Sequence, residues 1–139
     1  MCNIRYASMT DKPYWFTLDT HLSESEFERK VRDKRGYIIS EGCTPIGIMR
    51  YNLFWDNTPF LTLIHLEDSH HRKGFGTQTM RSWEAEMRTL GYKMLITSTR
   101  VDEDAQHFYR ALGYKDKGAL FLDHTPLEQP QELFLIKTL

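Results

Sequence analysis

One stretch of the sequence decides the fold, His70-His71-Arg72-Lys73-Gly74-Phe75-Gly76-Thr77, which follows an apolar run at residues 60–66. A segment in which apolar residues recur at helical spacing comes next, over residues 80–90. The two glycines let the backbone approach a ligand closely and turn several N–H groups the same way. The helix N-terminus behind them adds about half a positive charge, and the arginine and lysine add countercharge. The stretch therefore suits a phosphate or pyrophosphate.

This glycine loop is not specific on its own. Two glycines and a basic pair also form ordinary solvated turns, with no ligand. The Walker pattern GxxxxGK[ST] is absent, and the Rossmann pattern GxGxxG fails because Thr79 stands where the third glycine belongs. The loop alone leaves both a phosphate site and a plain turn open.

The length and composition of the chain exclude several classes of protein. The 139 residues predict one domain spanning residues 1–139, and the 40% of hydrophobic residues is enough for a core. A net charge of −1 gives no steering toward nucleic acid or an anionic membrane, so we expect neither as a partner. The longest apolar run is far shorter than the roughly 20 residues that span a bilayer, and no signal peptide is visible. We therefore expect a cytoplasmic protein.

Metal chemistry is not expected either. Cys2 and Cys43 have no metal-ligand spacing, and two free thiols in a reducing compartment is the plain interpretation. The adjacent pair His70-His71 has no third ligand at a suitable spacing.

The hydrophobic pattern around the loop predicts an α/β protein with a mixed sheet. Strands are expected at residues 3–7, 37–40, 45–55, 60–67, 93–99, 114–123 and 132–138. The third and fourth of these are expected to form an antiparallel hairpin in the middle of the sheet. Helices are expected to open at residues 10–13, which offer an N-cap and an early proline, and to run from a capping box at Ser23 to Gly36, over 80–90, and from an N-cap at Asp102 to Gly113.

A second block completes the pattern. Residues 102–114, DEDAQHFYRALGY, contain a helix that reaches Tyr109 and then the pair Gly113-Tyr114. Residues 71–76 stand where the motif [QR]xxGx[GA] is found in one family. With both blocks in register and the strands in that family's order, nearly the whole chain resembles the GNAT N-acetyltransferase superfamily.

The resemblance implies a fold and an activity. The fold would be a single-domain GNAT-like one, with a central mixed, mostly antiparallel sheet of about six or seven strands and helices on both faces. The activity would be direct transfer of an acetyl group from acetyl-CoA, as co-substrate, to a primary amine of an acceptor in a ternary complex. A non-catalytic acyl-CoA sensor on the same fold stays open as the alternative, and so does a homodimer formed through an edge strand.

The resemblance also implies site residues. Backbone groups of Leu66 and Glu67 would pair with pantetheine in a gap between two splayed strands. The loop would hold the pyrophosphate through His71, Arg72, Lys73, Gly74, Phe75, Gly76 and Thr77. Three residues of the next helix region, Asp102, Ala105 and Phe108, would also contact the cofactor. Tyr109 would protonate the departing thiolate as a general acid, or serve only as a core aromatic.

The sequence departs from the family's pattern at three positions. His71 replaces the usual Gln or Arg, and Asp102 stands where an Asn often contacts the cofactor. No general base is evident, because the positions where some members carry Glu or His are Phe60 and Thr62. Thr62 could order a water instead. His65 and Glu67 are the nearest titratable groups, and strict alternation places them on the face opposite Thr62 unless a bulge intervenes.

The acceptor would approach between the first two helices and the loop joining the last two strands. Trp15, Trp55 and Phe121 supply apolar surface there. Four carboxylates are candidates to anchor a cation, although each is also an ordinary surface residue type: Asp56, Asp123, Glu128 and Glu132.

Overall fold

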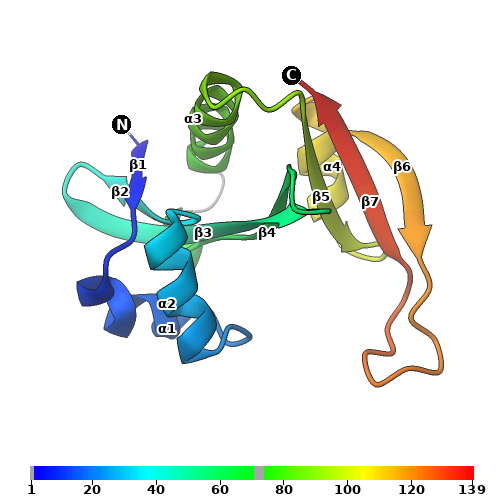
Figure 1. The fold of residues 1–139 in the computed structure, drawn as a ribbon, viewed down its shortest axis with the longest axis horizontal. Coiled ribbons are helices and arrows are strands. Elements are labelled where there is room, and N and C mark those ends of the chain that lie inside the picture. Colours follow the sequence, from blue (N-terminus) through cyan, green and yellow to red (C-terminus); the bar gives the residue numbers. More distant parts are fainter. Residues whose placement is uncertain (1, 71–73) are drawn as a thin grey trace.

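The computed structural model describes residues 2–70 and 74–139, which form a seven-stranded sheet with helices on both faces (Figure 1). The strands are β1 (Cys2–Tyr6), β2 (Gly36–Glu41), β3 (Thr44–Phe54), β4 (Thr58–Leu66), β5 (Met94–Arg100), β6 (Lys115–Leu120) and β7 (Glu132–Thr138). The helices are α1 (Lys12–Leu18), α2 (Glu24–Asp33), α3 (Phe75–Thr89) and α4 (Ala105–Ala111), with short 3-10 helices at Met9–Asp11 and Asp68–His70. The sheet order is β1-β2-β3-β4-β5-β7-β6. Neighbouring strands are antiparallel except β4 and β5, which confirms the expected fold class.

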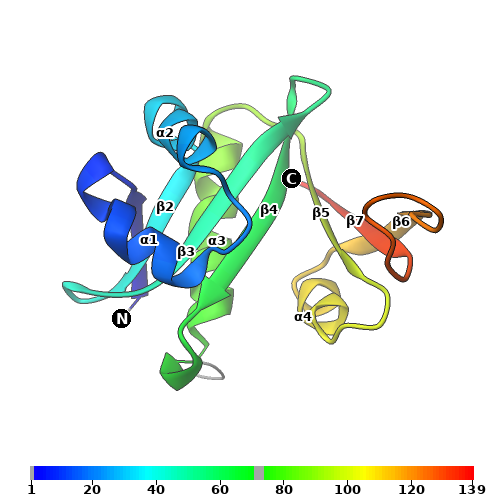
Figure 2. The same ribbon diagram turned by 90° about the horizontal axis from the view of Figure 1, so that it is seen from below.

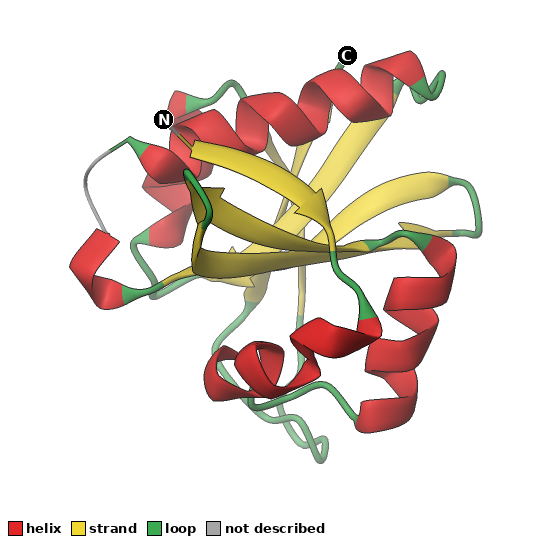
Figure 3. Ribbon diagram, turned by 90° about the vertical axis from the view of Figure 1, so that its left-hand side faces the viewer, coloured by secondary structure: helices red, strands yellow, loops and turns green. Residues whose placement is uncertain are grey.

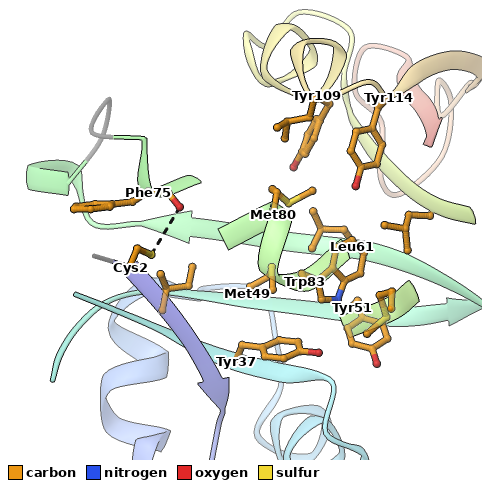
Figure 4. Packing of buried hydrophobic residues seen from close by; sticks show 14 of the residues in the cluster. Cys2, Tyr37, Met49, Tyr51, Leu61, Phe75, Met80, Trp83, Tyr109 and Tyr114 are labelled. Atoms are coloured by element: carbon orange, nitrogen blue, oxygen red, sulfur yellow. Dashed lines mark hydrogen bonds between the residues drawn. The ribbon is translucent and has the colours of Figure 1, made fainter. Parts of the chain in front are cut away.

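The helices divide into two layers. Helix α3 lies across one face of the sheet, and α1 and α2 lie on the opposite face (Figure 3). The larger core packs α3 and α4 against the sheet around Trp83 and Leu61 (Figure 4). The smaller core packs α1 and α2 around Trp15 and Phe27. No helix in either described range is long and apolar enough to cross a bilayer.

Helix α2 begins as predicted but ends elsewhere. The Ser23 hydroxyl accepts a hydrogen bond from the backbone N–H of Glu26 at 3.2 Å, which satisfies one unpaired donor of the first turn. The prediction that Gly36 ends this helix is wrong, because Lys34 closes it in the left-handed region with φ of 58°. Gly36 starts β2, where a Cβ would lie 3.4 Å from the Trp15 ring. Glycine at this position lets β2 pack closely against the ring of Trp15.

The start of α4 also differs from the prediction. The N-cap position is Asp104, two residues after the predicted Asp102. Asp102 is instead held by Arg100, whose Nη2 lies 3.0 Å from the carboxylate. Asp102 therefore binds the charged side chain of Arg100 and does not cap the helix.

Strand β4 carries one residue more than its partner β3. Arg50 pairs with Leu63 and Tyr51 pairs with Leu61, so Thr62 is the extra residue of a bulge. The bulge changes the alternation: Leu61 and Ile64 both face α3. The side chains of Thr62 and Glu67 then lie on the same side, that of α1, which strict alternation would not allow.

A lysine is buried between α2 and the sheet. Lys30 is 4% exposed, and its Nζ donates to the backbone oxygen of Tyr51 at 3.1 Å and to the side chain of Asn52. Burial, assisted by the positive charge of Arg50, lowers the pKa of Lys30 to about 8. The folded protein therefore releases this proton at a lower pH than the unfolded chain does.

We expect the stability contributed at Lys30 to rise with pH. Between pH 8 and about 10.4 the unfolded chain binds more protons at this lysine than the folded chain, so stability increases across that range. Relative to a Lys30→Met variant, the wild-type protein should gain roughly 2 kcal/mol between pH 7 and pH 9.5. Urea unfolding at the two pH values measures this difference. The exposed Lys117→Met variant is the control, and an equal pH response in both variants would contradict the lowered pKa.

Candidate functional site

The site begins where β4 and β5 separate. Among the described residues the two strands pair at two positions, Phe60 with Ile96 and Leu61 with Thr97. Figure 2 shows them together at one end and apart at the other, where β4 leads to the N-terminus of α3 and β5 to α4. Side chains from both helices line the space between the separated strands.

A cleft with a volume of about 620 Å³ occupies this space, a size typical of small-molecule sites. Its lining consists of Ile64, Leu66, Gly74, Gly76, Thr77, Asp104, Ala105, Phe108 and Tyr109. Seven of these were predicted cofactor or catalytic residues. Ile64 and Asp104 were missed, since an isoleucine in an apolar strand and an acid at a helix start are common features with no functional signal.

Glycine is required at positions 74 and 76 for two different structural reasons. Gly74 is the N-cap of α3 with φ of 78°, a conformation that favours glycine, and a Cβ there would meet no atom within 4 Å. Gly76 has Phe108 close by, so that a Cβ would lie 3.3 Å from the ring. Gly74 therefore turns the backbone beside open space, and Gly76 lets α3 approach α4.

Part of the predicted loop lies outside the described residues. His71, Arg72 and Lys73 belong to that part, and their contact with a pyrophosphate stays a prediction. The neighbouring α3 has fifteen residues, and its N-terminus faces the cleft through Gly74, Gly76 and Thr77. A helix start of this kind favours an anion.

Three predicted cofactor residues point their side chains away from the cleft. Phe75 is buried in the core beneath His70, with ring centroids 6.0 Å apart. The carboxylate of Glu67 accepts a hydrogen bond from the Tyr14 hydroxyl at 2.5 Å, on the α1 side of β4. Burial, and then this carboxylate, raise the pKa of Tyr14. Asp102 is exposed and paired with Arg100, as described above.

Tyr109 lines the cleft and is 6% exposed. Its ring packs edge-on against Phe108 and Tyr114, with centroids 5.3 Å and 5.8 Å away. Burial raises the pKa of Tyr109, and a hydrogen bond with Thr97 opposes this only in part. The phenol therefore keeps its proton near neutral pH and can donate it.

The neighbouring Tyr114 has its hydroxyl committed to the protein. It donates to the buried carboxylate of Glu84 at 2.9 Å, and Lys137 binds the other oxygen of that carboxylate at 2.8 Å. Figure 4 shows the hydroxyls of Tyr109 and Tyr114 pointing the same way. Of the two, only Tyr109 is among the described residues that line the cleft.

A second cavity, of about 390 Å³, adjoins the cleft and shares Ile64, Ala105 and Tyr109 with it. Its other lining residues are His21, Leu61, Thr62, Leu63, Thr97, Ser98, Thr99, Arg100, Glu103, Gln129 and Glu132. Tyr109 is therefore reached from two sides. His65 and Glu67 are not part of the described lining of either cavity.

The hydroxyl of Thr62 is engaged by a buried ion pair. It accepts from Nη1 of Arg50 at 2.9 Å and donates to the backbone oxygen of the same residue at 3.1 Å. Arg50 Nε donates to Asp19 at 2.9 Å, and Asp19 is 2% exposed. Burial would raise the pKa of Asp19, but hydrogen bonds from Arg50 and from two backbone N–H groups lower it overall. The sequence did contain one signal for this buried ion pair, which is an arginine within a largely apolar strand.

Comparison with known proteins agrees with this geometry. Residues 3–114 match the sequence profile of the Acetyltransferase (GNAT) family. Ard1 from Thermoplasma volcanium superposes with a TM-score of 0.84 at 13% identity, covering 99% of this chain and 97% of that one.

Two further solved structures share the fold. A GNAT family acetyltransferase from Elizabethkingia anophelis with acetyl-CoA bound gives a TM-score of 0.80 at 17% identity, covering 99% and 98% of the two chains. The ribosomal-protein-S18-alanine N-acetyltransferase from Escherichia coli gives a TM-score of 0.79 at 16% identity, covering 99% of this chain and 94% of that one. No curated protein matches the sequence.

Removing Arg50 should destabilise the protein strongly. An Arg50→Met variant leaves the carboxylate of Asp19 buried without its cation, which costs roughly 3 kcal/mol or more. Urea unfolding at neutral pH measures the loss. Arg110→Met is the matched control, since Arg110 binds Asp116 through two hydrogen bonds at the surface and exposed pairs contribute little. Similar losses in both variants would show that the Asp19–Arg50 pair has no special role.

Proposed function

Because the chain belongs to the Acetyltransferase (GNAT) family, we propose that it is an N-acetyltransferase that moves the acetyl group of acetyl-CoA directly to a primary amine. One observation carries this proposal: Tyr109 lines both the cleft at the N-terminus of α3 and the second cavity beyond it. A cofactor and an acceptor can approach the same hydroxyl from different sides. That arrangement supports direct transfer in a ternary complex.

The cleft offers each part of acetyl-CoA a suitable surface. Its apolar walls, at Ile64, Leu66 and Phe108, suit the pantetheine chain. The N-terminus of α3 at Gly74 suits the pyrophosphate, and we assign His71–Lys73 to the same anion. The bound cofactor supplies an activated thioester, so the protein needs no nucleophilic side chain.

The acceptor amine must lose a proton before it attacks. A lysine-like amine has a pKa of about 10.4, so roughly one molecule in 2,500 is neutral at pH 7, a deficit of about 4–5 kcal/mol. As the new C–N bond forms and the C–S bond breaks, the departing sulfur takes a proton from the hydroxyl of Tyr109. The nitrogen releases one proton as the amide forms, and a proton from solvent restores the phenol. Holding the two substrates side by side contributes much of the remaining acceleration.

A non-catalytic acyl-CoA sensor is the second candidate. The observation that favours it is that Arg50 engages the hydroxyl of Thr62 both as acceptor and as donor, so its one O–H is not available to order a water for the amine. A calorimetric titration with acetyl-CoA, with free ADP as the control, tests the cofactor assignment common to both candidates. Transfer to any member of a panel of primary amines then separates the enzyme from the sensor.

Substitution of Gly74 should abolish cofactor binding. In Gly74→Asp, a side chain and a negative charge both meet the pyrophosphate, and the residue is strained at φ of 78°. Calorimetry with acetyl-CoA measures the loss. Gly91→Asp is the matched control, since Gly91 has φ of 93° and open space around it at the other end of α3. Unchanged affinity in Gly74→Asp would refute the pyrophosphate assignment.

Removing the hydroxyl of Tyr109 should slow catalysis without weakening cofactor binding. A general acid contributes about 100-fold or more, so Tyr109→Phe should lower kcat by at least that factor. Steady-state kinetics with a responsive amine, together with acetyl-CoA calorimetry, separate the two effects. Tyr92→Phe, outside the described lining of both cavities, serves as the control. Equal kcat in the variant and the wild type would remove Tyr109 from the mechanism.

A further inference from the structure

The second cavity contains a carboxylate held by neutral groups. Glu132 is the first residue of β7, and it lines this cavity together with Tyr109. One carboxylate oxygen accepts from the hydroxyl of Ser98 at 2.6 Å, and the other accepts from Nε2 of Gln129 at 2.9 Å. The two donors fix the orientation of the carboxylate, and neither neutralises its charge.

One cation faces Glu132 across the strands, because Arg100 is its partner in the β5–β7 ladder and interacts with its charge, but Arg100 is shared among three carboxylates. Arg100 also lines the cavity, and its guanidinium binds Asp102 at 3.0 Å and Glu103 at 3.7 Å. Within residues 2–70 and 74–139, the structure shows no ion pair to Glu132, and His21 is the other basic residue of the lining. A fixed carboxylate of this kind is complementary to a cation that comes from outside the protein.

The other carboxylates that the sequence offered as cation anchors lie elsewhere. Glu128 accepts from the backbone N–H of His124, within the loop between β6 and β7. Asp123 lies 3.8 Å from the ring of His124 at the exposed side of that loop, and Asp56 lies in the turn between β3 and β4. Of these four acids, only Glu132 appears in the described lining of the second cavity.

Aromatic rings continue from Glu132 across the same face of the sheet. Phe134 lies two residues along β7, opposite Ser98, and its ring centroid is 5.8 Å from that of Phe60 on β4. Phe60 in turn packs edge-on against Phe54 on β3 at 6.1 Å. These three rings, here called the aromatic row, are each half-buried. They leave apolar surface beside the carboxylate.

The position of the aromatic row fits an acceptor. The neighbours of Phe134 and Phe60 along their strands, Leu135 and Leu61, pack in the core under α3, so the row faces the opposite side. Figure 1 shows the loop between β6 and β7 extending on that side, as α1 and α2 do. Charge and apolar surface therefore lie next to each other on the side from which the acceptor is expected.

We propose that Glu132 binds the positive charge of the acceptor and that the aromatic row binds its body, so that the acceptor is a primary amine on an apolar, preferably aromatic, group. The proposal rests on the proposed function and specifies its substrate class. The charge fixes one end of the molecule and the rings bury the other. A small hydrophilic amine would use only the first of these contacts.

The test compares three probes on the full chain saturated with CoA: 2-phenylethylamine, 2-phenylethanol and ethylamine. Calorimetry should detect binding of 2-phenylethylamine, and the alcohol, which has no charge, should bind roughly tenfold or more weakly. Ethylamine, which has no ring, should also bind much more weakly. Equal affinity for the amine and the alcohol, or no binding of the amine, would overturn the proposal. This comparison uses the wild-type protein and needs no variant.

Variants assign the effect to Glu132. Glu132→Gln should weaken the binding of 2-phenylethylamine roughly tenfold and raise the KM for this amine by a similar factor. The affinity for acetyl-CoA should stay unchanged. Glu128→Gln removes the same charge from the same region and should leave both values within about twofold. Equal behaviour of the two variants would overturn the role of Glu132. Failure of acetyl-CoA to bind the wild-type protein would instead refute the proposed function.

Discussion

The short contact between β4 and β5 is the constraint on which the site depends. In the described part of the chain these strands pair at Phe60–Ile96 and Leu61–Thr97, while β4 remains paired with β3, and β5 with β7. The sheet is therefore continuous at one end and open at the other. Helices α3 and α4 meet across the open end where Gly76 approaches Phe108. A cleft forms because the backbone separates there, and the surrounding side chains determine what it can hold.

The bulge at Thr62 adapts β4 to this opening. One extra residue brings Ile64 and Leu66 to the face that lines the cleft and turns Glu67 toward α1. An inserted residue loses ladder hydrogen bonds, and here Arg50 binds the Thr62 hydroxyl through both its backbone and its side chain. Asp19 holds that arginine from the end of α1. The ion pair thus connects the α1–α2 layer to the strand that forms one wall of the site.

The sequence was sufficient for features that depend on nearby residues. The glycine loop, the capping serine at Ser23 and the hairpin of β3 and β4 were predictable, because each has a local signal. Features that depend on distant partners were not. Glu67 is bound by Tyr14, 53 positions away, and Thr62 is bound by Arg50 across the hairpin. Gly36 was misassigned because its requirement is packing against Trp15, which no local pattern reports. The same reason explains why a bulge could be considered from the sequence but not located.

Three carboxylates of the chain differ in how their charge is balanced. Glu84, at 3% exposure, is bound by Lys137 and by the Tyr114 hydroxyl, and Asp19 is bound by Arg50. Both ion pairs are internal, so their charges are balanced when the protein folds. Glu132 differs, because its carboxylate is oriented by a hydroxyl and an amide, which leave its charge in place. Glu132 lines the same cavity as Tyr109, which is why we propose that the charge that completes it arrives with the molecule to be acetylated.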